Sequence, residues 1–347
     1  MSHAAAQKSR WHGIPTRYGT GWHTTSWFGQ NDLSRAPTAF SAAMNRLVRP
    51  SPDQIAPLSR MERVAFQIAD FLAQPKLSPI SKSYNTVVMG SLLWACGSRR
   101  FHMKGLEHLA PYGKKDSILF VANHRSFFDF FSVTAAVYWR TNLTRRIFFP
   151  VRQTFFYDHP LGPPVNLFMS GMRMFPPMMR DKGKRAFNQY SVARCIEELN
   201  REDIGTVMGL HPEGTRGKGA DPYTFLPAQP GVGRIALGAT RATVIPIFLL
   251  GMGQSIPGEM KVNLLAPAEH PVDLYFGPPI DFRDLRSRAS DPEVQLQASQ
   301  RCIDAIRAVS EIHRRDVDAR SGRPPAELPQ TRVQPKPART AEVSPAS

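Results

Sequence analysis

Cysteine and long apolar runs are both scarce in this sequence of 347 residues. Its three cysteines, Cys96, Cys195 and Cys302, lie far apart and are odd in number, so no disulfide framework or zinc-binding spacing is present. We therefore expect a reducing compartment. No apolar run approaches the roughly 20 residues that a spanning helix needs, and the N-terminus lacks the apolar core of a signal peptide. The protein is expected to be soluble or bound to a membrane surface.

Acidic residues are also few. The sequence has 44 lysines and arginines against 28 aspartates and glutamates, which gives a net charge of +16. A surplus of this size indicates a polyanionic partner, either anionic lipid or nucleic acid. The alternative is that basic tails, or a generally basic proteome, inflate the total. An aromatic-basic RNA motif and a DNA-recognition helix are both missing, so nucleic acid is not the expected partner.

Periodic patterns are missing at both ends of the chain. Residues 1–52 mix small and polar residues with scattered aromatic ones, and no period of 2 or 3.6 persists. We expect a flexible tail there, although Trp and Tyr among arginines are also typical of a membrane interface. Six prolines occur from Arg320 onward, and residues 316–347 are expected to form a disordered tail rich in Pro and Arg.

Residues 53–100 are expected to be helical. Ser59 with Glu62 three positions later is a capping box, which marks the start of a helix. The uncharged stretch 84–97, followed by Arg99, predicts either a buried helix or one that lies at a membrane surface. Apolar residues recur at helical spacing after Ser59, and we expect this stripe to pack in the core rather than face a membrane: Met61, Val64, Ala65, Ile68, Phe71 and Leu72.

Residues 101–315 alternate between predicted strands and helices, which indicates an α/β domain with a central sheet flanked by helices. Pro246 lies in the middle of one predicted strand and implies an edge, a bulge or a strand end there. The predicted helices cover 127–139, 183–200, 231–240 and 291–313. The predicted strands cover 118–122, 146–151, 205–210, 243–250, 261–265 and 272–276.

A histidine and an aspartate lie five positions apart where a predicted strand gives way to a helix. The motif, at 123–129, is Asn-His-x-Ser-x-x-Asp. Ser126 is a good N-cap, so the chain turns there and Asp129 in the first helical turn can reach back to His124. A His held by an Asp can act as a general base. Alternatively, Asp129 only caps the helix and His124 only bonds a carbonyl at the strand end.

A second polar motif follows the predicted strand 205–210. Gly214 permits a tight turn that exposes backbone amides. Thr215 and Arg216 can both donate hydrogen bonds to a phosphate, and Glu213 could hold that arginine or a hydroxyl group. The alternative is a surface turn with a local Glu–Arg ion pair, which would contribute about 1 kcal/mol or less.

These two motifs, followed by Val-Ile-Pro-Ile at 244–247, resemble the glycerolipid acyltransferase family, which makes phosphatidate and remodels phospholipids. The likeness covers roughly residues 101–285. It implies that His124 is the general base, that Asp129 orients it, and that residues 213–216 bind the glycerophosphate of an acceptor. A middle block of that family has its nearest match at 171–175. Its phosphate-binding arginine would be Arg173 or Arg180, and we prefer Arg180.

The resemblance implies transfer of a fatty acyl group from acyl-CoA or acyl carrier protein to the free hydroxyl of a lysophospholipid. The default acceptor is 1-acylglycerol 3-phosphate, which would give phosphatidate. No covalent acyl-enzyme and no cofactor are implied. No metal is expected either, because no third or fourth ligand clusters with His124 and Asp129 in the sequence. The expected location is peripheral, at the cytoplasmic face of an anionic membrane.

Two departures from the family pattern concern the acceptor. His211 stands where the family has an apolar aromatic residue, and a common lysine is replaced around Gln229. The acceptor could therefore be glycerol 3-phosphate, another lysophospholipid or an acylated amino acid. A different class of function is an inert protein that binds lipid or acyl carrier protein, but the intact His–Asp motif argues against it.

Overall fold

The computed structural model describes residues 48–321. It begins with the helices α2 (Pro52–Ile55), α3 (Arg60–Ala73), α4 (Ser78–Tyr84) and α5 (Gly90–Gly97), and a π-helical turn (Asn85–Met89) joins α4 to α5. The side chains of Ser59 and Glu62 exchange hydrogen bonds with each other's backbone N–H at the start of α3, which confirms the predicted capping box. The tail predictions for 1–47 and 322–347 lie outside the described residues.

A six-stranded sheet lies at the centre of the α/β body, which confirms the expected fold class. Its strands are β1 (Phe101–Lys104), β2 (Ser117–Ala122), β3 (Ile147–Phe148), β6 (Val207–Leu210), β7 (Ala242–Leu250) and β8 (Val272–Phe276). Their order is β1-β8-β7-β2-β6-β3, and every neighbouring pair is parallel except β7–β8. A second, two-stranded sheet pairs β4 (Val151–Arg152) with β5 (Pro177–Met178).

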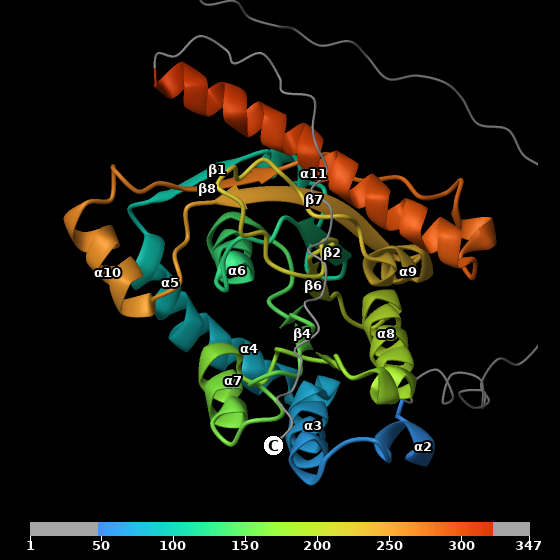
Figure 1. Cartoon of the computed structure of the whole chain (residues 1–347). Coiled ribbons are helices and arrows are strands. Elements are labelled where there is room, and N and C mark those ends of the chain that lie inside the picture. The colour runs from blue at the N-terminus through green and yellow to red at the C-terminus, as the bar shows by residue number, and fades with distance from the viewer. Residues whose placement is uncertain (1–47, 322–347) are drawn as a thin grey trace, which may run out of the picture. The chain divides into compact units, whose positions relative to one another are not determined.

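Helices cover both faces of the central sheet (Figure 1). The helices that follow β2 are α6 (Asp129–Arg140), α7 (Gly162–Ser170), α8 (Arg185–Asn200), α9 (Pro230–Gly238), α10 (Ile256–Leu265) and α11 (Pro292–Arg320), with 3₁₀ turns at Pro75–Leu77, Leu106–His108, Lys182–Lys184 and Arg286–Arg288. Along β2, Leu119 and Val121 join the apolar cluster that includes α8, α9 and α11. Ile118 and Phe120 join the cluster that includes α6. The strand is therefore buried on both faces, as expected for a parallel sheet between helix layers.

Several predicted elements have different bounds in the structure. The predicted strand 261–265 is wrong: it is the second half of α10, whose first turn is capped by the Ser255 side chain. The predicted strand 146–151 divides into β3 and β4. The last helix runs to Arg320 and so continues past residue 315, where the domain was predicted to end.

The turn between His124 and Asp129 also differs from the prediction. Helix α6 begins at Asp129, and Ser126 is not its N-cap. The Ser126 hydroxyl instead donates to the carbonyl oxygen of Gly253. Pro246 lies inside an inner strand rather than at an edge or an end. Its missing N–H falls where the β7–β8 ladder stops, because the first β7 residue paired with β8 is Ile247.

Four of the six residues in the predicted stripe on α3 face outward, which overturns the expectation of core packing for them, whereas Ala65 is buried in the core and Leu72 packs against it. Phe71 is 58% exposed, and Met61, Val64 and Ile68 are also exposed. The core side of α3 is formed mainly by alanines and Phe66. Among the described residues, no helix combines the length and the apolar character needed to cross a membrane.

Candidate functional site

The residues of the candidate site follow the carboxyl ends of three neighbouring parallel strands. β2 lies between β6 and β7 and pairs in parallel with both. The carboxyl ends of parallel strands meet at one edge of a sheet, where ligand sites of α/β folds typically lie. The two motifs and the segment 251–255 all follow these ends. Segments about 90 and 130 residues apart in sequence therefore meet, as shown by the hydrogen bonds from His124 N–H to Glu213 and from Ser126 to Gly253.

Asn123 fixes the direction of the chain as it leaves β2. Its side-chain amide donates to the Leu249 carbonyl oxygen at 2.9 Å and its side-chain oxygen accepts from the Leu249 N–H at 2.9 Å. These two hydrogen bonds thus take the place of one more backbone pair between β2 and β7. Because Asn123 is 1% exposed, these two bonds are shielded from water and hold the following histidine in place.

His124 and Asp129 meet as the sequence predicted. Nδ1 of His124 lies 3.0 Å from Oδ2 of Asp129. The same oxygen accepts the backbone N–H groups of Arg125 at 2.7 Å and Ser126 at 2.9 Å. Since a carboxylate only accepts, Nδ1 carries the hydrogen and Nε2 is the basic nitrogen. The side chain of His124 is 22% exposed and that of Asp129 only 2%, so a substrate can reach the imidazole.

Burial shifts the pKa values of both residues in the direction that favours their neutral forms. It raises the pKa of Asp129 to about 6, although His211 and the two backbone N–H groups oppose the shift. Burial, together with the positive charge of Arg216, lowers the pKa of His124 to about 4. Above pH 6 the pair therefore consists of an ionised carboxylate and a neutral imidazole. This is the state in which His124 can accept a proton.

His211 lies flat against His124. The ring centres are 3.8 Å apart and the planes differ by 10°, while the ring of Phe130 lies 4.3 Å from His211. Nδ1 of His211 lies 3.0 Å from the carbonyl oxygen of Ala122 and donates to it. Burial and the neighbouring His124 lower the pKa of His211 to about 3, so it is neutral at physiological pH.

The expectation that no third metal-binding side chain clusters with the pair was wrong. Donor atoms of His124, Asp129 and His211 lie within 4.8 Å of one another. However, Oδ2 of Asp129 and Nδ1 of both histidines already take part in hydrogen bonds. The Nε2 lone pairs of the two histidines lie in nearly parallel ring planes 3.8 Å apart, so they do not converge on one point as tetrahedral ligands must. The donor set fits a hydrogen-bonded pair better than a metal centre.

Glu213 supports the loop rather than holding Arg216. It is 4% exposed, and its two oxygens accept the backbone N–H groups of His124 at 3.0 Å and Leu226 at 2.8 Å. One carboxylate thereby ties the His124 segment to both ends of the 214–229 loop. Gly214 has a φ of 64°, a left-handed conformation that favours glycine, and it turns the chain so that Thr215 and Arg216 reach the surface.

Residues that sequence analysis missed complete this surface. Gln254 accepts from the guanidinium of Arg216 at 2.9 Å. The guanidinium of Arg152, at the end of β4, donates to the carbonyl oxygen of Gly214. Arg152 directly follows the predicted strand 146–151, and Gln254 lies four residues after the end of the predicted strand 243–250. A polar residue shortly after a predicted strand was the signal that the sequence offered for both. The alternative of a Glu213–Arg216 ion pair is not what the structure shows.

The two candidate phosphate-binding arginines have different surroundings. Arg173 is 2% exposed, donates to the Ala73 carbonyl oxygen and lies over the ring of Phe148. Arg180 is exposed, and its backbone N–H bonds the side chain of Gln153, the neighbour of Arg152. Arg180 is therefore the arginine of the two that a ligand can reach, beside the strand that touches Gly214.

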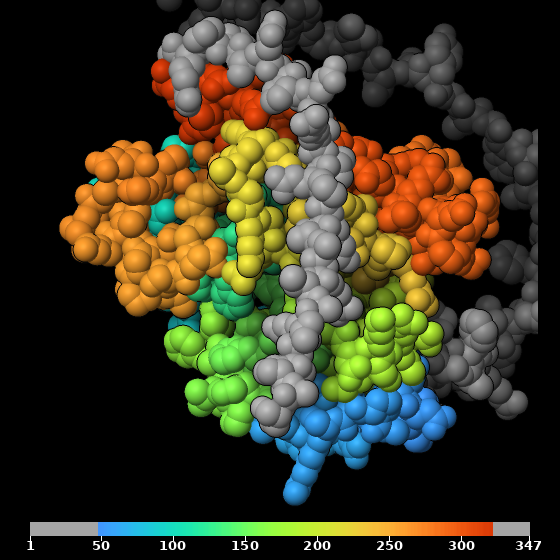
Figure 2. Space-filling model, in the orientation of Figure 1, coloured from blue at the N-terminus to red at the C-terminus, as the bar shows by residue number. Residues whose placement is uncertain are grey.

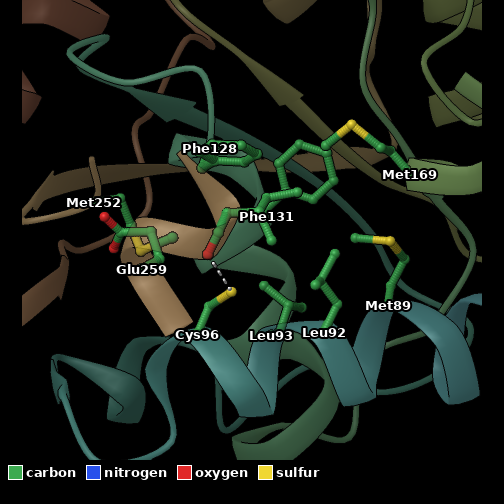
Figure 3. Close-up of a pocket in the computed structure, with 10 residues that line it drawn as sticks. Met89, Leu92, Leu93, Cys96, Phe128, Phe131, Met169, Met252 and Glu259 are labelled. Carbon is green, nitrogen blue, oxygen red and sulfur yellow. Dashed lines mark hydrogen bonds between the residues drawn. The ribbon is translucent and has the colours of Figure 1, made fainter. Parts of the chain in front are cut away.

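A small apolar pocket lies beside the His–Asp turn (Figure 3). Its volume is about 20 Å³. Phe128, which precedes Asp129, points into it from above, and α5 closes it from below. Glu259, paired with Arg100 at 2.6 Å, is its one charged residue. The lining residues are Met89, Leu92, Leu93, Cys96, Phe128, Phe131, Met169, Met252, Ile256 and Glu259.

The fold is an α/β domain that presents a His–Asp pair and the turn at 213–216 at the carboxyl edge of its parallel strands. Residues 100–250 match the sequence model of the family described as Acyltransferase. This segment carries an acyltransferase domain similar to that of the glycerolipid acyltransferases, and the chain is an acyltransferase. The match includes β2, β6 and β7 with the loops that follow the first two. A comparison with curated proteins gives no significant match.

Proposed function

We propose that this acyltransferase moves a fatty acyl group from an acyl thioester, acyl-CoA or acyl carrier protein, to the free hydroxyl of 1-acylglycerol 3-phosphate, giving phosphatidate. The observation that carries the proposal is the buried Asp129 carboxylate 3.0 Å from Nδ1 of His124. Asp129 fixes the tautomer and stabilises the imidazolium that forms when Nε2 takes the hydroxyl proton. The hydroxyl oxygen then bonds the thioester carbon, the C–S bond breaks, and the sulfur takes the proton back.

Positive charge around the 214–229 loop supports a phosphate-bearing acceptor. The exposed Arg216 and Arg180, with the hydroxyl of Thr215, offer donors that suit a phosphate monoester. Holding the phosphate there would bring the acceptor hydroxyl to His124 and make the attack effectively unimolecular, which can supply several kcal/mol.

The apolar pocket is the proposed place for an acyl chain. At about 20 Å³ it holds no more than about one water molecule as it stands, so a chain enters only if its walls part. Three methionines, Met89, Met169 and Met252, line it, and flexible methionine side chains repack readily.

A peripheral membrane contact is proposed for the exposed apolar face of α3, α4, α5 and α7. These helices are neighbours: Tyr84 donates to the Phe168 carbonyl oxygen at 3.0 Å, and α3 contacts α4. Exposed large apolar side chains gather there, with Lys76 and Arg99 beside them to meet anionic lipid: Met61, Val64, Ile68, Phe71, Ile80, Val87, Trp94, Leu167 and Phe168.

The first test is turnover by the wild-type protein and by His124→Ala. Both are given 1-acylglycerol 3-phosphate and a long-chain acyl-CoA in detergent, with free CoA and phosphatidate measured together. We expect equal amounts of the two products from the wild type and a drop of at least about 10²-fold in the variant. Equal activity in both proteins would show that His124 is not the base. Turnover only with another acceptor would replace lysophosphatidate in the proposal.

The membrane contact is tested by flotation with vesicles of anionic phospholipid. Phe71→Ser should weaken binding by at least about tenfold, because a buried Phe side chain contributes about 1.5–3 kcal/mol and each 1.4 kcal/mol is tenfold. The matched control is Leu296→Ser on α11, where the native side chain is 46% exposed. An equal loss in both variants, or no loss in either, would contradict the assignment of this face.

A further inference from the structure

A second histidine–aspartate pair lies outside the candidate site, between β8 and α11. Nε2 of His313 is 3.1 Å from Oδ2 of Asp273, and both residues are buried, at 1% and 4% exposure. Nδ1 of His313 is 2.9 Å from the hydroxyl of Tyr223. Since the carboxylate only accepts, Nε2 carries the hydrogen and, in the neutral ring, Nδ1 accepts from Tyr223. His102 and Arg320 also contact Asp273, at 3.3 Å each.

Asp273 keeps its charge in this cluster. Burial opposes ionisation, but the hydrogen bonds from His313 and Arg320 outweigh it and hold the pKa of Asp273 below its ordinary value. The fixed negative charge orients His313, and His313 in turn fixes the hydroxyl of Tyr223. No residue of the candidate site takes part in this chain of hydrogen bonds.

Tyr223 lies in the middle of the 214–229 loop and is held on three sides. Its ring stacks on Phe248 of β7 with centres 5.4 Å apart and planes at 12°. The guanidinium of Arg314 lies 4.3 Å from the ring centre. Asp221 turns the loop by accepting the Tyr223 N–H at 3.1 Å. The middle of the loop is thus attached to α11 and to the sheet, independently of the catalytic side.

The two ends of the same loop are attached to the candidate site. Gly217 N–H donates to the His124 carbonyl oxygen at 2.8 Å, and Leu226 N–H donates to Glu213 at 2.8 Å. Between these anchors and Tyr223 the loop runs at the surface, in yellow in Figure 2, between α10 and α11. Thr215 and Arg216 lie at the start of the same loop, next to the Gly217 anchor.

We propose that Tyr223, His313 and Asp273 form a brace that positions the 214–229 loop for the phosphate of the acceptor. They are positioning residues, because they act through the loop and touch no substrate. The proposal rests on the proposed function of Thr215 and Arg216 as phosphate donors. It gives α11 a role in acceptor binding although its residues lie far along the chain from both motifs.

The test compares Tyr223→Phe with Tyr275→Phe. The first change removes one hydroxyl and keeps the stacked ring. The second removes the hydroxyl of Tyr275, a buried tyrosine of β8 that bonds Asp316 of α11 but does not bond the loop. One lost hydrogen bond corresponds to about a two- to tenfold effect. We expect the KM for 1-acylglycerol 3-phosphate to rise by that factor in Tyr223→Phe alone, with the KM for acyl-CoA unchanged. His313→Gln is the second variant and should act in the same direction.

Amide hydrogen exchange of peptides within 214–226 separates the brace from the function of the loop. Exchange should become faster in Tyr223→Phe and stay unchanged in Tyr275→Phe. Unchanged exchange in Tyr223→Phe would overturn the brace. Faster exchange without a rise in acceptor KM, when Arg216→Ala raises that KM, would overturn the positioning role. If Arg216→Ala also leaves the acceptor KM unchanged, the proposed function of Arg216 fails, and the exchange result alone decides the brace.

Discussion

Replacing Asp129 with asparagine should lower turnover by about four orders of magnitude. The carboxylate lies 3.0 Å from the ring nitrogen that shares the positive charge when His124 takes a proton. With an effective dielectric constant of about 20, the attraction between the two charges at this distance is about 5.5 kcal/mol. Each 1.36 kcal/mol is tenfold in rate, so its loss corresponds to about 10⁴-fold in kcat.

Asparagine at 129 should preserve the shape of the turn. Its side-chain oxygen can still accept the N–H groups of Arg125 and Ser126, which now bond Oδ2 at 2.7 and 2.9 Å. We therefore expect KM values within a few fold of the wild type. Because burial raises the pKa of Asp129 from 3.8 to about 6, its stabilising contribution is lost as pH rises through 6. At pH 7 the variant should therefore melt at the same temperature or higher.

The assay follows thiol release from acyl-CoA with a chromogenic thiol reagent, alongside a thermal melt. The melt shows whether lost activity comes from lost structure. A variant that is folded and keeps more than a tenth of the wild-type kcat would refute the argument, because the carboxylate charge would then contribute little to proton transfer.

Three further predictions follow from single contacts. Between pH 6 and pH 4, kcat/KM should fall as the Asp129–His124 pair gains a proton, and a flat profile down to pH 4 would contradict His124 as the base. Arg146→Met should lower the free energy of unfolding in urea by about 3 kcal/mol, because the buried Glu198, now 2.5 Å from Arg146, loses a partner. An unchanged midpoint of urea unfolding would contradict this prediction. Arg180→Ala should raise the acceptor KM about tenfold without changing the acyl-CoA KM, as loss of a charge-assisted bond requires.

The order of local patterns along the chain was enough to predict the centre of the site. The apolar segment 118–122 lies within β2 and the segment 205–210 contains β6; both strands are buried throughout, and each is followed at once by polar residues. Parallel strands align their carboxyl ends, so two distant motifs had to meet at one edge. The short spacing from His124 to Asp129 also made their contact a local matter, although the turn is not capped by Ser126 as predicted.

Contacts between distant segments decided what the sequence left open or predicted wrongly. The apolar stripe that includes Phe71 and the segment 261–265 have sequence patterns that are compatible with more than one environment. The packing of neighbouring elements decides that Phe71 lies at the surface and that 261–265 is helical. The stack of His211 on His124 and the bonds from Tyr223 to His313 join residues about 90 positions apart. Periodicity and capping report on neighbours within one helix or strand. Which face is covered, and which polar group meets which, depends on the three-dimensional arrangement of the whole sheet.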